Sequence, residues 1–396
     1  MLIEKFATSR GTASSEFLDL KRTSKFTILV SLLIPKYARD ASIKERRTSE
    51  SGHERSWRGP EMDDPLRLHR EAIIIDATCP LARSHQYIDW WREGGATAIA
   101  PTITGMSGNA QSGLREIGGW HRYVRERDDA LIVRTAADIE RAKAEGKLGL
   151  ILHCQGTSIV EDELDFLDAY AAAGLRMVQL CYNRRNLIGD GATERTDSGL
   201  SHFGLAVISR LNALRLVIDC AHTGLRTTFD AIEASLAPVV ISHANAIAVH
   251  QNGRNVPDEL IRAIAASGGI VGTVGFPAFL GDESRPSLDR FIDDIVYKAD
   301  LTSIDHVGLG IDYYEGQHGV ESDAVALARY ERRIREGHWR REEYPPPPYY
   351  YPAGIETPRT LERLTARLAE RGFDEPEIRK VLGLNWLRVF RSVWGG

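Results

Sequence analysis

The stretch EAIIIDATCPLAR, residues 71–83, has the pattern of a buried β-strand that ends at the rim of an active site. Its three consecutive isoleucines have no polar residue between them, as expected for a strand that is covered on both faces. They lead directly into the polar residues Asp76 and Thr78, followed by Pro80. Strands buried on both faces are typical of parallel sheets, so this stretch predicts an α/β fold.

Seven further apolar runs of the same kind follow, and amphipathic stretches with helical spacing separate them. Together the eight runs are AIIIDAT (72–78), ATAIAPTI (96–103), LGLILHC (148–154), MVQLCYN (177–183), RLVIDCAH (215–222), PVVISHA (238–244), GIVGTVGF (269–276) and HVGLGIDY (306–313). Eight strands that alternate with helices predict a (β/α)8 barrel over residues 63–396, with further helices at its C-terminal end. A doubly wound open sheet is the alternative, although no Gly-x-Gly-x-x-Gly motif follows the first run.

The first 62 residues differ in composition from the rest of the chain. They are rich in Ser, Arg, Lys and Glu, and their apolar patch FTILVSLLIP (26–35) is too short to span a bilayer. We therefore predict that residues 1–62 form a poorly ordered N-terminal extension.

Composition and charge limit the possible classes of function. The hydrophobic fraction of 43% and the charged fraction of 27% are typical of soluble globular proteins, and a formal net charge of -5 gives no reason to expect nucleic-acid binding. The four cysteines lie far apart in the sequence, at Cys79, Cys154, Cys181 and Cys220. They indicate neither a disulfide framework nor a zinc knuckle, so we predict a cytoplasmic protein with no nucleic-acid and no membrane partner.

Polar residues at the ends of the predicted strands are the candidates for catalysis, because the active sites of (β/α)8 barrels lie at the C-terminal ends of the strands. His222 and His243 end the fifth and sixth runs, and Asp312 ends the eighth. Neutral imidazoles bind zinc and similar ions, and a nearby carboxylate can take or deliver a proton. The pattern predicts a metal site with an acid or base, whereas His153 favours a structural role in the core.

Three further features have two interpretations each. Arg254, in QNGRNVPDE, either binds a substrate carboxylate through its planar guanidinium or lies in a solvated loop. The loop GDGATERTD (189–197) is a candidate rim or lid of the site. The tract YPPPPYYYP (344–352) could act as a polyproline ligand, but next to a compact C-terminal region we expect an ordered loop that covers the barrel.

Several segments resemble the membrane (renal) dipeptidase family of zinc metallopeptidases. They are LRLVIDCAHTG, APVVISHANA, GRNVPDELIRAIAASGGIVG, IDHVGLGIDY and PRTLERLTARLAERGFDEPEIRKVLGLNWLRVF. The similarity extends in order over roughly residues 65–396. It implies a (β/α)8 TIM barrel of the metal-dependent hydrolase type, with a binuclear zinc site that hydrolyses dipeptides, usually in a homodimer.

The resemblance also implies roles for single residues. His222 and His243 match the two histidine ligands of the second zinc ion. Asp312 matches the aspartate that acts as general acid or base near the substrate amine, and Arg254 matches the arginine that holds the substrate carboxylate.

This sequence departs from the family's pattern at three places. The first strand of the family ends in His-x-Asp, which supplies two ligands of the first zinc ion, whereas Thr78 and Pro80 stand here. The glutamate that bridges both ions is replaced by Gln155, with Cys154 as the neighbouring possibility. The substrate-binding histidine after the fourth strand is replaced by Tyr182.

These losses predict a reduced site in which His222, His243 and Gln155 hold one zinc ion. Tyr182 is predicted to take part in catalysis and, with its neighbour Asn183, in substrate binding. The leading hypothesis is the hydrolysis of a dipeptide or a similar small amide by a homodimeric enzyme. The alternatives are a non-catalytic binding protein on the same barrel, or a barrel enzyme with a changed reaction, such as cleavage of another amide, a lyase step or a decarboxylation.

Overall fold

A computed structural model describes residues 64–105 and 107–395. The predicted N-terminal extension, residues 1–62, lies outside these ranges. None of the helices in the described ranges has the length and hydrophobicity that a membrane span needs.

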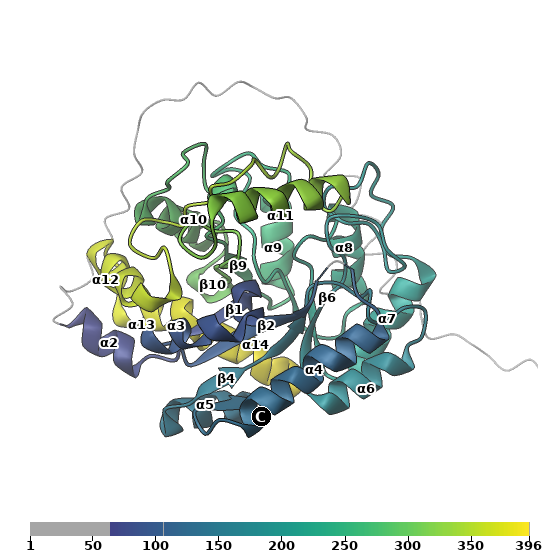
Figure 1. The fold of residues 1–396 in the computed structure, drawn as a ribbon, viewed down its shortest axis with the longest axis horizontal. Helices are drawn as coiled ribbons and strands as arrows, with labels where there is room; N and C mark the ends of the chain where they lie inside the picture. Colours follow the sequence, from purple (N-terminus) through teal and green to yellow (C-terminus); the bar gives the residue numbers. More distant parts are fainter. Residues whose placement is uncertain (1–63, 106, 396) are drawn as a thin grey trace, which may run out of the picture. The chain divides into compact units, whose positions relative to one another are not determined.

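The core of the described chain is a barrel of parallel strands (Figure 1). Each of the predicted apolar runs overlaps a strand, and the run LGLILHC contains two short ones. The strands are β1 (Ile75–Cys79), β2 (Ala98–Thr104), β3 (Ala130–Ile132), β4 (Leu148–Leu150), β5 (Leu152–Cys154), β6 (Leu175–Gln179), β7 (Val217–Asp219), β8 (Val239–Val240), β9 (Val271–Thr273) and β10 (Val307–Leu309). Their order around the barrel is β8-β7-β6-β5-β2-β1-β10-β9, and β3 pairs with β4 at the side.

The ring closes between β8 and β9, immediately after the last residue of β8. Ile241 forms a parallel bridge with Val271. The Ile241 amide donates to the Ile270 carbonyl at 2.9 Å, and the Gly272 amide donates to the Ile241 carbonyl at 2.8 Å. The sheet is therefore closed, which confirms the predicted (β/α)8 barrel and excludes the open-sheet alternative.

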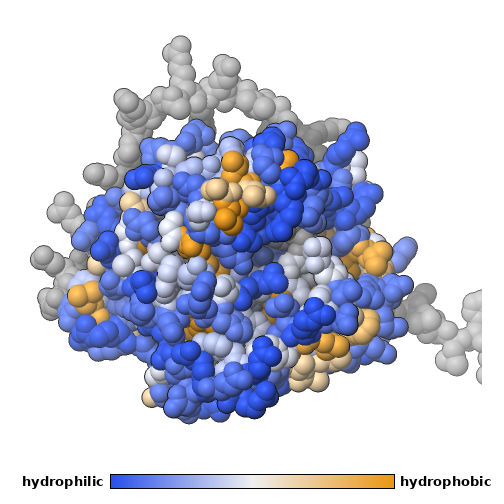
Figure 2. Space-filling model, viewed as in Figure 1, coloured by the Kyte–Doolittle hydropathy of each residue, from blue (hydrophilic) through white to orange (hydrophobic). Residues whose placement is uncertain are grey.

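Helices surround the barrel, and the surface that they present in Figure 2 is mainly hydrophilic with small separate hydrophobic patches. Several begin at side-chain caps; Thr135 and Asp138, for example, form a capping box at the start of α5. The helices are α2 (Pro65–Glu71), α3 (Ile88–Glu93), α4 (Ala110–Arg125), α5 (Ala136–Glu145), α6 (Asp165–Ala173), α7 (His202–Ala213), α8 (Leu225–Ala234), α9 (Asp258–Ala266), α10 (Leu288–Leu301), α11 (Asp323–Arg335), α12 (Glu362–Glu370), α13 (Glu375–Arg379) and α14 (Asn385–Trp394).

Helix α14 closes the end of the barrel where the strands begin. Its residues Trp386 and Phe390 belong to one buried apolar cluster with strand residues such as Ile75 and Met177. The indole nitrogen of Trp386 also donates to the Leu309 carbonyl at 3.0 Å. Because this end is filled with apolar side chains, a polar site has room only at the opposite end, where the strands finish.

The opposite end is covered by α11 and by the tract at residues 344–352 (Figure 1). Tyr344, Tyr349 and Tyr351 in this tract are each 2% exposed. The prediction of an ordered covering loop is therefore confirmed, because its tyrosines are packed against the molecule instead of being presented to a partner.

Candidate active site

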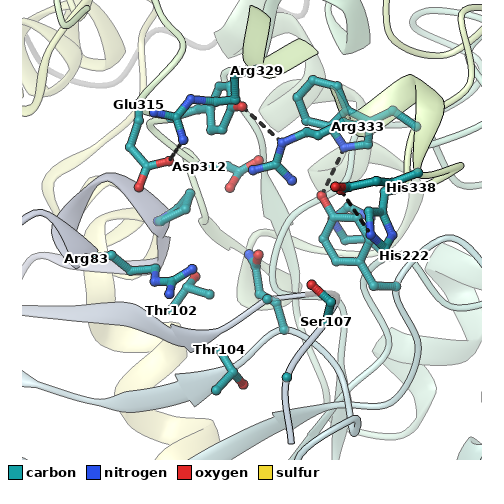
Figure 3. Close-up of a pocket in the computed structure, with 18 of the residues that line it drawn as sticks. Arg83, Thr102, Thr104, Ser107, His222, Asp312, Glu315, Arg329, Arg333 and His338 are labelled. Carbon is teal, nitrogen blue, oxygen red and sulfur yellow. Dashed lines mark hydrogen bonds and ion pairs between the residues drawn. The ribbon is translucent and has the colours of Figure 1, made fainter. Parts of the chain in front are cut away.

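A cavity of about 750 Å³ lies at the C-terminal ends of the strands, where the barrel architecture predicts the active site. Four of the predicted site residues line it: Gln155, Tyr182, His222 and Asp312. The remaining wall comes mainly from the segments at the ends of β1 and β2, from α11 and from the segment after α11. Figure 3 shows the labelled side chains of Asp312, Arg333 and His222 grouped around this cavity.

His222 and His243 face each other just beyond β7 and β8, as predicted. Their Nε2 atoms lie 2.8 Å apart, and their exposed fractions are 4% and 0%. The ring of Tyr182 stacks on His222, with the two centroids 3.9 Å apart. His222 lines the cavity, and His243 lies behind it.

Hydrogen bonds to the other ring nitrogens fix the tautomers of both histidines. Ser242 donates its hydroxyl proton to Asp219 at 2.6 Å, so its oxygen accepts from Nδ1–H of His243 at 2.7 Å. Asn183 donates its amide nitrogen to a backbone carbonyl after α11 at 3.0 Å, so its oxygen accepts from Nδ1–H of His222 at 2.8 Å. In the neutral rings both Nε2 atoms therefore present lone pairs to each other.

Two lone pairs at this distance repel each other unless a cation lies between them. Burial lowers the pKa of both imidazoles, that of His243 to about 3, so a shared proton is disfavoured. Metal-binding histidines usually donate their second ring N–H to a fixed acceptor, as both rings do here. The arrangement of His222 and His243 therefore suits a metal ion such as zinc.

The side chains at the ends of the strands do not provide enough ligands for two metal ions. Thr78 and Pro80 replace the ligands of the first zinc ion, and the Thr78 hydroxyl donates to the Ala77 carbonyl at 2.8 Å. Among the described residues, no three His, Cys, Asp or Glu side chains are grouped so that they could hold an ion. A second metal centre of the family's type therefore has no ligands in this part of the chain.

His222 and His243 can bind one ion if other ligands complete its coordination. Zinc–nitrogen bonds of about 2.0–2.1 Å at a tetrahedral angle separate the two nitrogens by about 3.4 Å, so the rings would move slightly apart. Gln155 lines the cavity, where its amide oxygen could serve as a ligand. Cys154 is instead enclosed in β5, where its thiol points to the Met177 carbonyl. Gln155 is therefore the better placed of the two candidates, with water or substrate in the remaining positions.

Asp312 has the properties of a group that exchanges protons. Burial raises the pKa of its carboxyl to about 8, although the charges of Arg254 and Arg333 and the nearby Gln155 amide act in the opposite direction. Its carboxyl is therefore largely protonated at neutral pH, and a group with such a pKa can both donate and accept a proton.

Tyr182 is placed to donate a hydrogen bond into the cavity. Its hydroxyl oxygen accepts from the indole nitrogen of Trp339 at 3.2 Å, which leaves the hydroxyl proton for another acceptor. Burial raises the pKa of the phenol, so the proton is retained at neutral pH. This position is consistent with the predicted role in catalysis and substrate binding.

Arg254 and Asn183 lie behind the cavity wall. Arg254 is 2% exposed, and its Nε donates to the Tyr344 hydroxyl at 3.1 Å. Asn183 donates to the same hydroxyl at 3.1 Å and is 0% exposed. Neither residue lines this cavity, so neither makes the predicted contact with a substrate there; Arg254 lines a smaller neighbouring cavity of about 200 Å³, together with His222. Asn183 anchors His222 instead.

Positive φ angles mark three of these residues. Asn183, His222 and Asp312 have φ values of 59°, 60° and 64°. Such angles are unfavourable for residues other than glycine and are concentrated at functional sites. Two amides, of Asn183 and Ala192, donate to the His222 carbonyl at 3.2 and 2.8 Å and hold this conformation in place.

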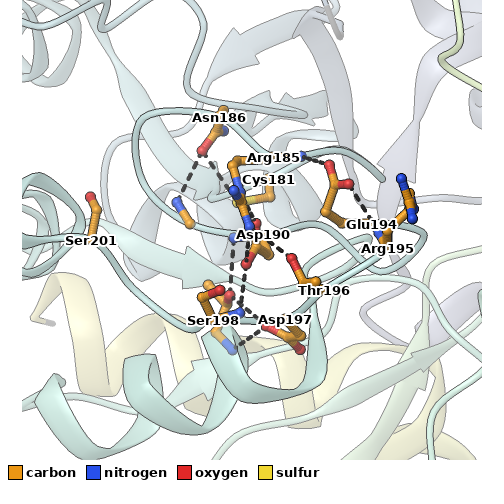
Figure 4. A network of polar contacts seen from close by, with 12 residues as sticks. Cys181, Arg185, Asn186, Asp190, Glu194, Arg195, Thr196, Asp197, Ser198 and Ser201 are labelled. Carbon is orange, nitrogen blue, oxygen red and sulfur yellow. Dashed lines mark hydrogen bonds and ion pairs between the residues drawn. The ribbon is translucent and has the colours of Figure 1, made fainter.

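The loop GDGATERTD is a fixed support for this conformation (Figure 4). Asp190 pairs with Arg185 and accepts from the Ser198 amide at 2.6 Å. Asp197 accepts from the Arg226 amide at the start of α8, also at 2.6 Å. The loop was a candidate rim or lid, and its polar contacts tie it to the body of the barrel.

His153 has the structural role that its sequence context favoured. It is 0% exposed, and its Nε2 lies 3.0 Å from Asp219. Asp219 also accepts from the amide and the hydroxyl of Ser242, at 2.8 and 2.6 Å. His153 therefore supports the carboxylate that orients Ser242, and through it His243.

Among the cavity residues that were not singled out from the sequence are Arg333 and Trp339, and Tyr344 was noted only as part of the tract at residues 344–352. They lie well beyond β10, so the rule that site residues follow barrel strands does not identify them. The density of aromatic residues in HWRREEYPPPPYYY (338–351) is the signal that could have indicated an enclosed surface there.

The closed barrel and the polar site at its strand ends define a hydrolase of the metal-dependent (β/α)8 class. Residues 91–336 and 349–394 match the model of the membrane dipeptidase family (Peptidase family M19). The chain therefore belongs to the membrane dipeptidase family, as its sequence resemblance indicated, and is a hydrolase of that family.

Individual relatives agree with this assignment. A protein from the pqqA 5' region of Klebsiella pneumoniae is 30% identical over 270 residues, which are 66% of this chain and 88% of that protein. An amidohydrolase structure from Pseudomonas aeruginosa is 31% identical, has a TM-score of 0.76, and is matched over 84% of this chain and 100% of its own. A Rhodobacter sphaeroides metallopeptidase, solved with a phosphinate mimic of the dipeptide L-Ala-D-Ala, shares the fold at 22% identity, with a TM-score of 0.68 and matches over 82% and 100% of the two chains.

Proposed function

We propose that this protein hydrolyses the amide bond of a dipeptide or a similar small amide with a single zinc ion. The observation that carries the proposal is the pair of anchored imidazoles, whose Nε2 lone pairs converge 2.8 Å apart next to a cavity that Asp312 also lines. His222, His243 and Gln155 would hold the ion. When bound, zinc would polarise the scissile carbonyl and lower the pKa of a water molecule.

The side chains of the cavity supply the other parts of the reaction. In its ionised form, Asp312 would take a proton from the attacking water and then deliver it to the leaving amine. Tyr182 would donate its hydroxyl proton in a hydrogen bond to the substrate. Asn183 and Ser242 would keep His222 and His243 in the tautomers that present Nε2.

Zinc content and turnover test this proposal together. We expect about one zinc ion per chain in the purified protein, and hydrolysis of members of a dipeptide panel that a chelator abolishes. His243→Ala should lose the ion. Asn183→Leu and Ser242→Ala should weaken zinc binding by about 10–100-fold, because each removes an acceptor that orients a ligand.

Ser235→Ala is the matched control for the serine variant, because Ser235 bonds to Asn212 and Ala237 at the end of α8. It should keep the zinc affinity of the unaltered protein. Full activity of a metal-free preparation would contradict the proposal, and so would a zinc content that does not depend on His243.

We further propose that the protein works in the cytoplasm as a homodimer. The cytoplasmic location is supported by the cysteines, since Cys79, Cys154, Cys181 and Cys220 are all unpaired and buried. The homodimer is supported by the family resemblance, and light scattering of the purified protein measures its mass directly.

A further inference from the structure

Arg254, which matches the family's arginine for the substrate carboxylate, does not line the large cavity and lines a neighbouring one of about 200 Å³. Tyr344 accepts from Nε of Arg254 and stacks on Trp339, with the ring centroids 4.3 Å apart and the planes inclined by 4°. Tyr344 and Trp339 both lie in residues 337–348, the segment that falls between the two parts matching the family model. The covering of Arg254 is therefore built from residues outside the family's common pattern.

Four arginines line the large cavity, Arg83, Arg329, Arg332 and Arg333. Arg333, near the end of α11, differs from the others because two aromatic rings hold its guanidinium. Its central carbon lies 4.8 Å from the ring centroid of Trp339 and 5.2 Å from that of Tyr314. Its Nε donates to the Tyr314 hydroxyl at 3.1 Å. Two aromatic rings thus hold the guanidinium, and Figure 3 shows it beside Asp312.

The charge of Arg333 acts on the predicted catalytic groups. It contributes to lowering the pKa of Asp312, of Tyr182 and of His222, although burial is the largest influence on each of the three. Arg333 lines the same cavity as these three groups, so it can hold one end of a substrate whose other end reaches them.

We propose that Arg333, and not Arg254, binds the carboxylate of the substrate in this protein. This inference rests on the proposed amide hydrolysis and specifies its substrate: an amide with a free carboxylate that points toward α11. The planar guanidinium can bind a carboxylate through two parallel hydrogen bonds, which a lysine could not reproduce. The cavity volume of about 750 Å³ lies in the range that holds ligands larger than a small dipeptide.

A pair of non-hydrolysable ligands tests the subsite. The ligands are a phosphinate mimic of a dipeptide and the same compound with its carboxylate converted to a carboxamide. Calorimetry on the purified protein gives the Kd of each. We expect the acid to bind roughly 10–100-fold more tightly than the amide, the ratio expected for a charge-assisted hydrogen bond.

Arg333→Gln should reduce this ratio to about one and leave the Kd of the amide unchanged, which also shows that the variant is folded. Arg333→Lys should keep part of the ratio. Arg254→Gln should keep all of it, and so should Arg335→Gln, the control at an exposed position on the same helix.

The proposal is overturned if Arg333→Gln keeps the ratio, if Arg254→Gln abolishes it, or if the unaltered protein binds both ligands equally. The two proposals fail separately. If the ratio of the two Kd values depends on Arg333 but the protein hydrolyses no amide, the carboxylate subsite is supported and the hydrolase proposal is refuted. If the protein hydrolyses amides but the ratio does not depend on Arg333, the hydrolase proposal is supported and the subsite is refuted.

Discussion

Individual histidines in this protein have different roles because their ring nitrogens have different partners. In His222 and His243, one nitrogen donates to a fixed acceptor and the other presents a lone pair to the opposite ring. In His69, Nε2 lies 3.0 Å from the Gly94 carbonyl and Nδ1 lies 2.7 Å from the Thr365 hydroxyl. Both nitrogens of His69 are satisfied within the protein, so it is a structural residue that joins α2 to α12.

His69 should make the stability of the protein depend on pH. Burial lowers its pKa from 6.5, so the folded state binds this proton less readily than the unfolded state does. Its contribution is therefore complete above pH 6.5 and is lost as the pH falls from there toward the lowered folded value. In urea titrations, His69→Gln should flatten the pH dependence of the unfolding free energy by up to about 1.4 kcal/mol per pH unit in that window.

Equal slopes for His69→Gln and the unaltered protein between pH 5 and 6.5 would show that the ring is not buried in its neutral form. Zinc content is the companion measurement. It should be the same in both proteins, because neither His69 nor its partners Thr365 and Gly94 line the cavity.

Between elements, the site depends on how closely β8 and β10 approach each other. A Cβ atom added at Gly310 would overlap the Ser242 carbonyl oxygen and lie 3.3 Å from Cβ of His243. Glycine is therefore required after β10 so that Ser242 and His243 keep their positions. The reason is the close approach of the backbone at Gly310 to the backbone at Ser242, and not the φ angle of Gly310.

Gly310→Ala should destabilise the protein by about 1–3 kcal/mol, because the added methyl group overpacks a rigid contact. It should also weaken zinc binding, since Ser242 orients His243. Gly118→Ala is the matched control: it lies inside α4 and an added Cβ meets no atom within 4 Å. The control should be stabilising by about 0.5–1 kcal/mol. Urea unfolding of both variants measures the difference, and two changes of the same sign would contradict this account.

At the scale of the whole molecule, the two ends of the barrel have separate tasks. One end is filled by α14. The other end, which α11 covers (Figure 1), holds the cavity. Stability and function can therefore be altered independently.

Trp386→Ala tests this separation, because Trp386 is 0% exposed at the closed end. The variant should lose about 3–5 kcal/mol of unfolding free energy in urea while the folded protein keeps its zinc affinity. Trp90→Ala, at a half-buried position on α3, should cost less. A loss of zinc affinity in folded Trp386→Ala would mean that the two ends are coupled.

The sequence by itself determined the barrel and the polar residues at the ends of its strands. Buried parallel strands appear as continuous apolar runs, and the residue that follows each run lies at the site whatever the details of packing. The replacement of the first zinc ligands by Thr78 and Pro80 was visible in the same way, because a ligand's identity is a property of one position.

Only the tertiary structure decided the tautomers of His222 and His243, the covering of Arg254 and the exposure of Arg333 to the cavity. Each depends on contacts between residues far apart in the chain; Arg254 and Tyr344, for example, are separated by 90 positions. Such contacts follow from the packing of irregular segments, which carry no periodic signal that a sequence could reveal.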